Sequence, residues 1–146
     1  YYIDTFNSAP GDHSAKMGDI TKSPKASEEV SGRPAGSVLT AECEIDGISF
    51  MLLNGGPVEQ FKLNGATSYI IECETQEEID YFWEKLSAVP EAEQCGWCTD
   101  KFGVTWQVTP RILDEMMRDP EKAEAVTAVF MPMKKLDLEA IRKAGE

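Results

Sequence analysis

The sequence is poor in positive charge and in long hydrophobic runs. Its 14 lysines and arginines stand against 26 aspartates and glutamates, which gives a formal net charge of -12. A chain of this charge repels phosphate groups, so we expect neither nucleic acids nor anionic membranes as partners. The longest apolar runs, such as Phe50 to Leu53, have the length of a strand and fall far short of the roughly 20 residues of a membrane span. The sequence therefore predicts a soluble protein.

Cysteine and histidine are also scarce. The chain has four cysteines, Cys43, Cys73, Cys95 and Cys98, and they lie in apolar or β-like segments. Small secreted proteins held by disulfides have a denser set, so we expect reduced thiols and a cytoplasmic location. The single histidine, His13, lies in a polar segment, where we expect a solvated side chain.

The length and composition support one domain over residues 1–146. A chain of 146 residues with 42% hydrophobic content can bury one core and is too short for two independent ones. The apolar spacing of residues 1–6 is typical of the last turns of a buried helix. The rest of the segment 1–36 is rich in Gly, Pro, Ser and charged residues, and we expect a loop with one short strand near 17–21.

The segment 37–66 predicts a β-hairpin. Its apolar residues alternate with polar ones from Leu39 to Ile45, which is the period of a strand with one buried face. Asp46-Gly47 then favours a type I′ turn, and the run 48–54 resumes the β pattern. Gly55-Gly56-Pro57 is expected to end the hairpin.

The segment 67–109 predicts a βαβββ unit, and 110–146 a helical tail. A strand over 67–73 leads into Thr75 and Glu78, which are spaced as a helix capping box. A helix with one apolar face follows, then β-like pieces around 93–99 and a strand over 104–109. The tail contains three expected helices, which begin at Pro110, Pro120 and Asp137.

Four segments in this order resemble the PhnB-like family, which is also labelled the 3-demethylubiquinone-9 3-methyltransferase family. They are Leu53-Asn54-Gly55-Gly56-Pro57, Cys73-Glu74-Thr75-Gln76-Glu77-Glu78, residues 95–108 and Met133-Lys134-Lys135-Leu136-Asp137. The resemblance implies an α+β fold of the glyoxalase-like, vicinal oxygen chelate type, in which paired βαβββ modules surround a ligand cavity. It also implies that the first strand and part of the first helix precede Tyr1.

The methyltransferase label has no support in the residues. The nearest glycine-rich turn, Asn54-Gly55-Gly56-Pro57, follows a hairpin rather than a parallel crossover, and no amphipathic helix comes after it. The sequence therefore contains no recognisable S-adenosylmethionine motif. Whether the protein is an enzyme stays open at this point.

The resemblance also bears on metal chemistry. Metal-dependent members of the wider superfamily bind a divalent ion with His and Glu side chains, the last of them four residues after a glycine in a motif similar to 102–107. Gln107 occupies that position here. Because an amide oxygen is a poorer ligand than a carboxylate, we predict no metal site and no cofactor.

We predict instead that Gln107 orients a small organic ligand. Thr105 is expected on the same face of the strand, and Asn54 at the end of the hairpin. Trp97 is a candidate shelf for a flat ligand, and Cys95 a candidate contact or nucleophile. The alternatives are that Gln107 only bonds a neighbouring strand, that Trp97 is a core residue, and that Cys95 and Cys98 are structural.

Three functions remain open on the sequence. The leading prediction is a metal-independent protein that binds or transforms a small organic molecule in a cavity. The alternatives are a binding or sequestering protein without turnover, and a divalent-metal-dependent lyase or dioxygenase. Four methionines in the tail, Met116, Met117, Met131 and Met133, exceed what short helices need for their own packing, and family members commonly pair, so we also expect a homodimer.

Overall fold

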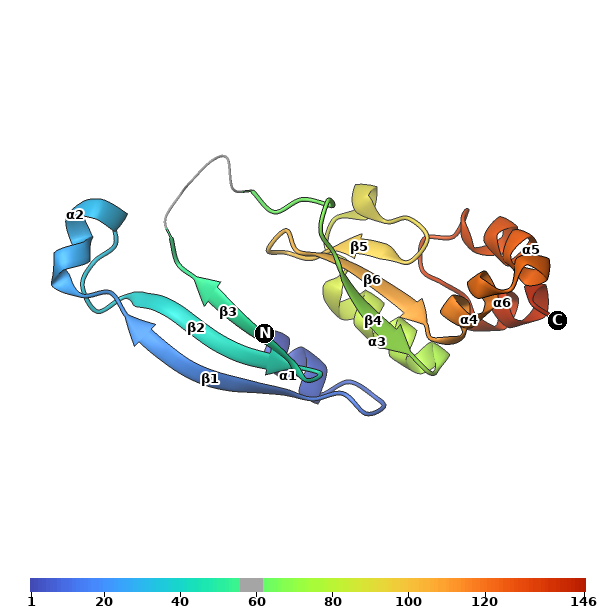
Figure 1. Cartoon of the computed structure of the whole chain (residues 1–146), viewed down its shortest axis with the longest axis horizontal. Coiled ribbons are helices and arrows are strands. Elements are labelled where there is room, and N and C mark those ends of the chain that lie inside the picture. Colours follow the sequence, from blue (N-terminus) through green and yellow to red (C-terminus); the bar gives the residue numbers. More distant parts are fainter. Residues whose placement is uncertain (56–61) are drawn as a thin grey trace. The chain divides into compact units, whose positions relative to one another are not determined.

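The chain forms two compact units, each with its own three-stranded sheet (Figure 1). The computed structural model describes residues 1–55 and 62–146, and the units cover Tyr1–Lys62 and Leu63–Glu146. The mixture of helices and sheets confirms the predicted α+β class. The predicted end of the hairpin at Gly56-Pro57 lies outside the described residues. The single domain over residues 1–146 stays a prediction.

The first unit is an antiparallel sheet in the order β1-β2-β3, preceded by a short helix. Its elements are α1 (Tyr2–Asn7), β1 (Ala15–Lys22), η1 (Lys25–Ser27), α2 (Glu28–Ser31), β2 (Val38–Ile45) and β3 (Ile48–Leu53). The helix end before residue 7 is confirmed. The polar segment after it contains an eight-residue strand, longer than the predicted one. The register of β1 shifts between Met17 and Ile20, and this bulge hides the period-two pattern from the sequence.

The predicted hairpin is confirmed. Asp46 and Gly47 both have positive φ, 47° and 79°, as a type I′ turn requires, and Ile45 pairs with Ile48 directly beside the turn. In the described part of the chain no strand pairs with the outer edge of β3. The strand carries no charge, and five of its six residues are exposed, four of them apolar: Ile48, Met51, Leu52 and Leu53.

The second unit has β6 at the centre of its sheet. β4 pairs with β6 in parallel, and β5 pairs with it antiparallel. The elements are β4 (Tyr69–Cys73), α3 (Gln76–Leu86), η3 (Pro90–Ala92), β5 (Trp97–Thr99), β6 (Thr105–Pro110), α4 (Ile112–Arg118), α5 (Pro120–Phe130) and α6 (Leu138–Ala144). Gln94 adds a bridge to Trp97 before β5. The order is therefore βαββ, one strand fewer than the predicted βαβββ unit, and only the isolated bridge at Gln94 stands where the additional strand was expected.

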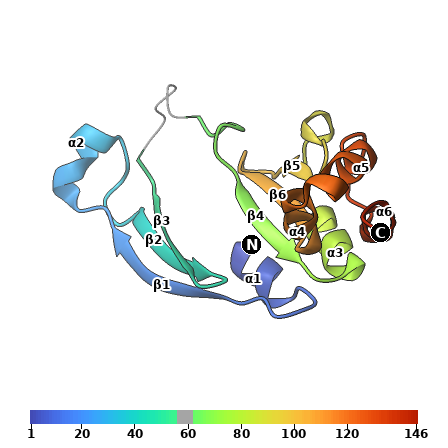
Figure 2. The ribbon, with the colours of Figure 1, turned by 45° about the vertical axis from the view of Figure 1, so that its right-hand side comes forward.

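Helix α3 lies against one face of this sheet (Figure 2). Ile79, Phe82 and Leu86, at the predicted helical spacing, are completely buried. Trp106 and Val108 of β6 are buried as well, whereas Gln107 between them is only partly buried. Because side chains alternate along a strand, Gln107 points to the opposite face, away from α3.

The start of α3 differs from the predicted capping box in one bond. The Thr75 hydroxyl accepts the Glu78 N–H at 3.2 Å, as predicted. The Glu78 carboxylate, however, accepts the N–H of Glu74, one residue before the cap. Glu78 is only 4% exposed and is not the solvated surface residue expected from its charge. It satisfies an amide that precedes the helix.

The tail forms a hydrophobic cluster that is fastened to the sheet. Met116, Val126, Leu136 and Ile141 are its buried members. Asp119 and Asp137 cap α5 and α6, as their positions predicted. Pro110 was expected to begin a helix, but it is the last residue of β6. The next residue, Arg111, still donates its backbone N–H to the Cys73 carbonyl of β4, so the sheet extends through Pro110. None of the helices in 1–55 and 62–146 is long and apolar enough to cross a membrane.

Two backbone bonds connect the tail to the residues before β5. The N–H of Cys95 donates to the Met133 carbonyl at 2.6 Å, and that of Gly96 to the Lys134 carbonyl at 2.8 Å. Gln76, at the start of α3, adds a side-chain bridge, with its amide nitrogen on the Leu136 carbonyl at 3.1 Å. These bonds fix the tail against the sheet that carries Gln107.

Candidate functional site

Gln107, the main ligand contact predicted from the sequence, lies on the face of the second sheet opposite α3. Gln107 is paired with Trp97 of β5 on one side and with Ile70 of β4 on the other. Paired residues on neighbouring strands project to the same face. The three side chains therefore form a row across the sheet, with the amide between an indole and an aliphatic group.

The amide of Gln107 is held in one orientation. Its Nε2 donates to Ser68 Oγ at 2.8 Å, just before β4 begins. No described residue donates a hydrogen bond to its Oε1. One of the two amide N–H groups is thus used within the protein, as the alternative interpretation of Gln107 expected, while its role toward a ligand stays a prediction. Nothing in the sequence marked Ser68, because it lies outside any motif.

The neighbours of Gln107 differ in how much surface they offer. Ile70 is 62% exposed and Trp97 is partly buried. Thr105, which was predicted beside Gln107, lies on the same face of β6 but is only 7% exposed, and it pairs with Thr99. Ile70 was missed because a single exposed isoleucine in a strand reads as core from the sequence. Trp97, Gln107 and Ile70 together are called the sheet-2 shelf below.

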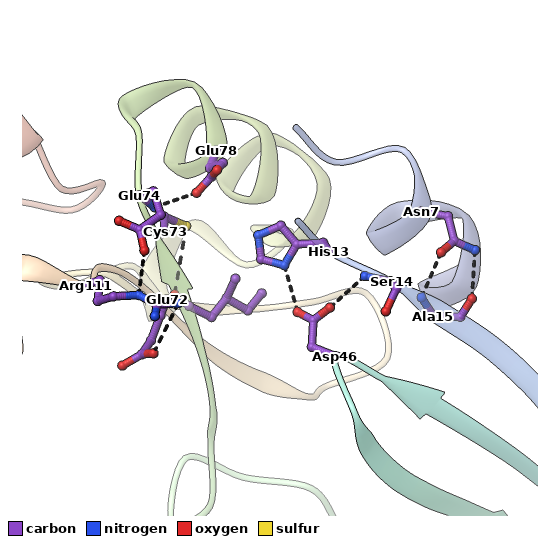
Figure 3. A network of polar contacts seen from close by, with 11 residues as sticks. Asn7, His13, Ser14, Ala15, Asp46, Glu72, Cys73, Glu74, Glu78 and Arg111 are labelled. Carbon is purple, nitrogen blue, oxygen red and sulfur yellow. Dashed lines mark hydrogen bonds and ion pairs between the residues drawn. The ribbon is translucent and has the colours of Figure 1, made fainter. Parts of the chain in front are cut away.

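The positive charge of Arg111 at the end of this sheet is compensated by two carboxylates. Arg111, which follows β6, has its Nε 2.7 Å from a Glu74 carboxylate oxygen, and its Nη2 lies 3.8 Å from Glu72 (Figure 3). Glu72 is paired with Thr109 on β6, two residues beyond Gln107. The guanidinium is thus already occupied, and it leaves no uncompensated positive charge beside the shelf.

Cys95 and Cys98 have the environment of structural cysteines. Cys95 lies before β5 with a positive φ of 39°, so it is outside the strand rather than on its face. Burial raises the pKa of the Cys95 thiol. Cys98 is completely buried, and burial, followed by the charges of Asp100 and Glu93, raises the pKa of its thiol to about 12. Since the thiolate is the nucleophile, neither residue is activated for attack near neutral pH.

Asn54 belongs to the first unit, where it closes the hairpin. Its Nδ2 donates to the Val38 carbonyl at 3.0 Å, and its backbone N–H donates to Leu39 at 2.8 Å. The side-chain donor is therefore spent on β2. A role of Asn54 in ligand binding stays a prediction, which would use the remaining carbonyl oxygen.

His13 is not the solvated side chain expected from its polar surroundings in the sequence. Its Nδ1 lies 2.7 Å from Asp46 Oδ2, and its side chain is only 9% exposed (Figure 3). The second carboxylate oxygen of Asp46 accepts the Ser14 N–H at 2.8 Å. The turn of the hairpin thus holds the end of the loop before β1. A pair 33 residues apart leaves no local pattern from which it could be predicted.

No three His, Cys, Asp or Glu side chains of residues 1–55 and 62–146 are close enough together to bind a metal ion. Two hollows of about 400 and 640 Å³ lie on the surface. The first is on sheet 1 beside the Lys16–Glu44 ion pair, and the second is between the start of α3 and α6. Gln107 does not line either of these two hollows.

Comparison with known proteins identifies relatives. Residues 1–109 match the family model described as 3-demethylubiquinone-9 3-methyltransferase. Among solved structures, the chain is similar to a PhnB protein from Bacillus cereus that carries the same methyltransferase description. The two share 27% sequence identity with a TM-score of 0.54, over 75% of this chain and 84% of that one. No curated protein matches the chain.

Proposed function

The chain belongs to the 3-demethylubiquinone-9 3-methyltransferase family of PhnB-like proteins, and on this basis we propose that it binds or transforms a small organic molecule without a metal ion. We place the ligand on the sheet-2 shelf, with Gln107 as the polar contact and Trp97 as the flat one. We keep three weaker candidate contacts. Thr105 is nearly buried, Cys95 lies outside β5, and the Asn54 amide already donates to the Val38 carbonyl.

The observation that carries the proposal is the orientation of the Gln107 amide. Ser68 Oγ accepts one of its N–H groups at 2.8 Å, and the acceptor oxygen is thereby held between two apolar side chains. A polar group fixed in an otherwise apolar surface is the usual arrangement of a small-molecule site, because it orients the ligand while the apolar contacts supply affinity.

We do not extend the proposal to methyl transfer. The glycines after Asn54 follow an antiparallel hairpin strand, not the parallel strand and helix that a nucleotide-type cofactor site uses. A binding or sequestering function without turnover is the second candidate. It is favoured by the raised thiol pKa of Cys95, because this leaves the shelf without an activated nucleophile.

The first test is a metabolite screen on the full chain by thermal shift, with each hit followed for turnover. Hits should raise the unfolding temperature. Gln107→Ala should lower the affinity for a hit about threefold to tenfold, since one hydrogen bond is lost, and the rise in unfolding temperature should become smaller. Glu84→Ala, on the exposed side of α3, is the control and should behave as the unaltered protein. Hits bound equally well by Gln107→Ala would remove Gln107 from the site.

A second test separates metal-dependent chemistry from the leading proposal. The protein is purified without chelator and its metal content is measured. We expect less than stoichiometric amounts of any divalent ion. A stoichiometric transition metal that is needed for turnover would favour the third candidate, a metal-dependent lyase or dioxygenase.

We further propose a homodimer and a cytoplasmic location. Met116 is buried in the tail cluster and Met133 packs against it, whereas Met117 and Met131 are 40% and 46% exposed. These two side chains are therefore the tail methionines available to a second copy. Light scattering after size-exclusion chromatography tests the dimer, with Met117→Gln and Met131→Gln expected to weaken it. The location is supported by the four free cysteines.

A further inference from the structure

The sheet-2 shelf has a composition that selects among small molecules. Resting on the function proposed above, we infer that its ligand is an uncharged, ring-containing molecule with an N–H or O–H donor, and that phosphorylated and other anionic molecules are excluded. Three features of the described sheet carry this inference: the fixed direction of the Gln107 amide, the apolar groups on both sides of it, and the charges at the end of the sheet.

The direction of the amide decides which polar group the ligand must carry. A glutamine side chain offers both donors and an acceptor, and in solution it can turn either end toward a ligand. Here Nε2 is bonded to Ser68 Oγ, and Oε1 receives no hydrogen bond from the described residues. Ser68 uses one of the two Nε2 protons, and the shelf presents the free acceptor Oε1, which pairs with a ligand N–H or O–H.

The flanking groups decide the body of the ligand. Trp97 and Ile70 are the direct partners of Gln107 on the two neighbouring strands, and strands are separated by about 4.8 Å. The row therefore extends about 10 Å from one apolar group to the other. A planar ring laid across it covers the exposed isoleucine and the indole while its polar edge reaches the amide oxygen. Both contacts gain from removing apolar surface from water.

The charges at the end of the sheet decide against anions. The side chains on this face are Trp97, Thr99, Thr105, Gln107, Thr109, Ile70 and Glu72, and none of them is cationic. Arg111 is bound to Glu74 at 2.7 Å and lies 3.8 Å from Glu72. A phosphate or carboxylate on the shelf would thus meet a carboxylate without a free cation, in a protein of net charge -12.

The test compares three probes that share one ring system: indole, 1-methylindole and indole-3-acetate. Each is titrated into the full chain, and binding is followed by NMR through the indole N–H of Trp97 and the side-chain amide of Gln107. We expect indole to bind about threefold to tenfold more tightly than 1-methylindole, which lacks the donor. We expect indole-3-acetate, which keeps the donor and adds a negative charge, to bind more weakly than indole.

Two variants connect the preference to the amide. Gln107→Leu should bring indole and 1-methylindole to equal affinity, and Ser68→Ala should reduce the difference because the amide is then free to turn. Glu84→Ala should keep the unaltered preference. Equal binding of indole and 1-methylindole by the unaltered protein, or tightest binding of indole-3-acetate, would overturn the ligand class alone. If none of the probes moves the Trp97 and Gln107 signals, the shelf is not a ligand site, and the proposed function falls with the inference.

Discussion

Asp100 shows how much one buried side chain organises in this protein. It is 1% exposed, and its carboxylate accepts the N–H groups of Phe102 and Val104 and the indole N–H of Trp106, at 2.8, 3.0 and 2.9 Å. Three bonds of this kind replace the water that a buried carboxylate loses. The loop between β5 and β6, and thereby the start of the strand that carries Gln107, is built around this residue.

Replacing Asp100 should therefore be costly. Asp100→Ala leaves the buried indole N–H of Trp106 and two part-buried backbone N–H groups without an acceptor, and we expect a loss of about 2–4 kcal/mol in the free energy of unfolding. Asp100→Asn keeps one acceptor oxygen and should lose less. Urea denaturation measures both, with the exposed Glu77→Ala as control. An Asp100→Ala protein as stable as the control would show that the loop does not depend on the carboxylate.

The buried thiols make stability depend on alkaline pH. The pKa values of Cys73 and Cys98 are raised to about 12, in each case chiefly by burial, from the ordinary value of 9.0 for an exposed thiol. Between these two pH values the unfolded chain loses thiol protons that the folded chain keeps. The free energy of unfolding should thus fall as the pH rises from about 9 toward about 12, and these thiols cost no stability below that window.

The matched test uses Cys98→Ala and Cys43→Ala. The first removes a buried thiol, so its stability should fall less steeply between about pH 9 and about pH 11 than that of the unaltered protein. The second removes a partly exposed thiol and should keep most of the original slope. Denaturation curves at several pH values decide. Identical slopes for both variants would contradict the assignment.

Among the elements, the turn before β5 has the strictest steric requirement. Gly96 has a φ of +87°, and a Cβ placed on it would lie 3.1 Å from Leu136 Cδ1 and from the Val108 carbonyl oxygen. Leu136 and Val108 are both buried. The Gly96 N–H also donates a hydrogen bond to the Lys134 carbonyl. The tail can approach the sheet this closely only because position 96 has no side chain.

Gly96→Ala should therefore weaken both the turn and the attachment of the tail. We expect a loss of about 2–4 kcal/mol, the sum of a strained backbone and a crowded side chain. Gly103→Ala is a close control, because its φ is +86° but its new Cβ would meet only Leu63 Cβ at an ordinary 3.8 Å. The difference between the two variants in thermal unfolding isolates the crowding. Equal losses would mean that backbone strain alone explains the effect.

The elements that could be predicted are those whose pattern is local. The I′ turn at Asp46-Gly47, the apolar face of α3 and the caps Asp119 and Asp137 all follow from residues a few positions apart. Strand β1 could be predicted only in part, since its bulge disrupts the alternation that marks a strand. Contacts between distant residues, such as His13 with Asp46, leave no local pattern to read.

The candidate site was predictable to the same extent. The alternation along β6 placed Gln107 and Thr105 on one face, which the structure agrees with. The partner that orients the amide, Ser68, is 39 residues away, and it could be found only from the pairing of β4 with β6. Thr105 is only 7% exposed, and the alternation along β6, which predicts the face of a side chain, does not predict how deeply it is buried.

At the scale of the whole molecule, the net charge of -12 should make stability depend on salt. Like charges repel one another more in the compact state than in the unfolded chain, and added ions screen this repulsion. We expect the unfolding temperature to rise by a few degrees as NaCl increases from about 0.01 to about 0.2 M. Equal osmolarity of sucrose serves as a control for solvent effects. An unfolding temperature that falls with added NaCl would contradict this expectation.

The free edge of β3 has a practical consequence for work with this chain. In residues 1–55 and 62–146 no strand pairs with the outer edge of β3, which is uncharged and exposes four apolar side chains. Such an edge is a template for other strands, so concentrated solutions should slowly form β-rich aggregates. Met51→Lys is a specific remedy, since residue 51 is paired with Glu42 on β2 and the new charge gains a cross-strand partner. Dynamic light scattering over days should show a growing particle size for the unaltered protein and a constant one for the variant. Storage life, rather than ligand binding, would be the first property to improve.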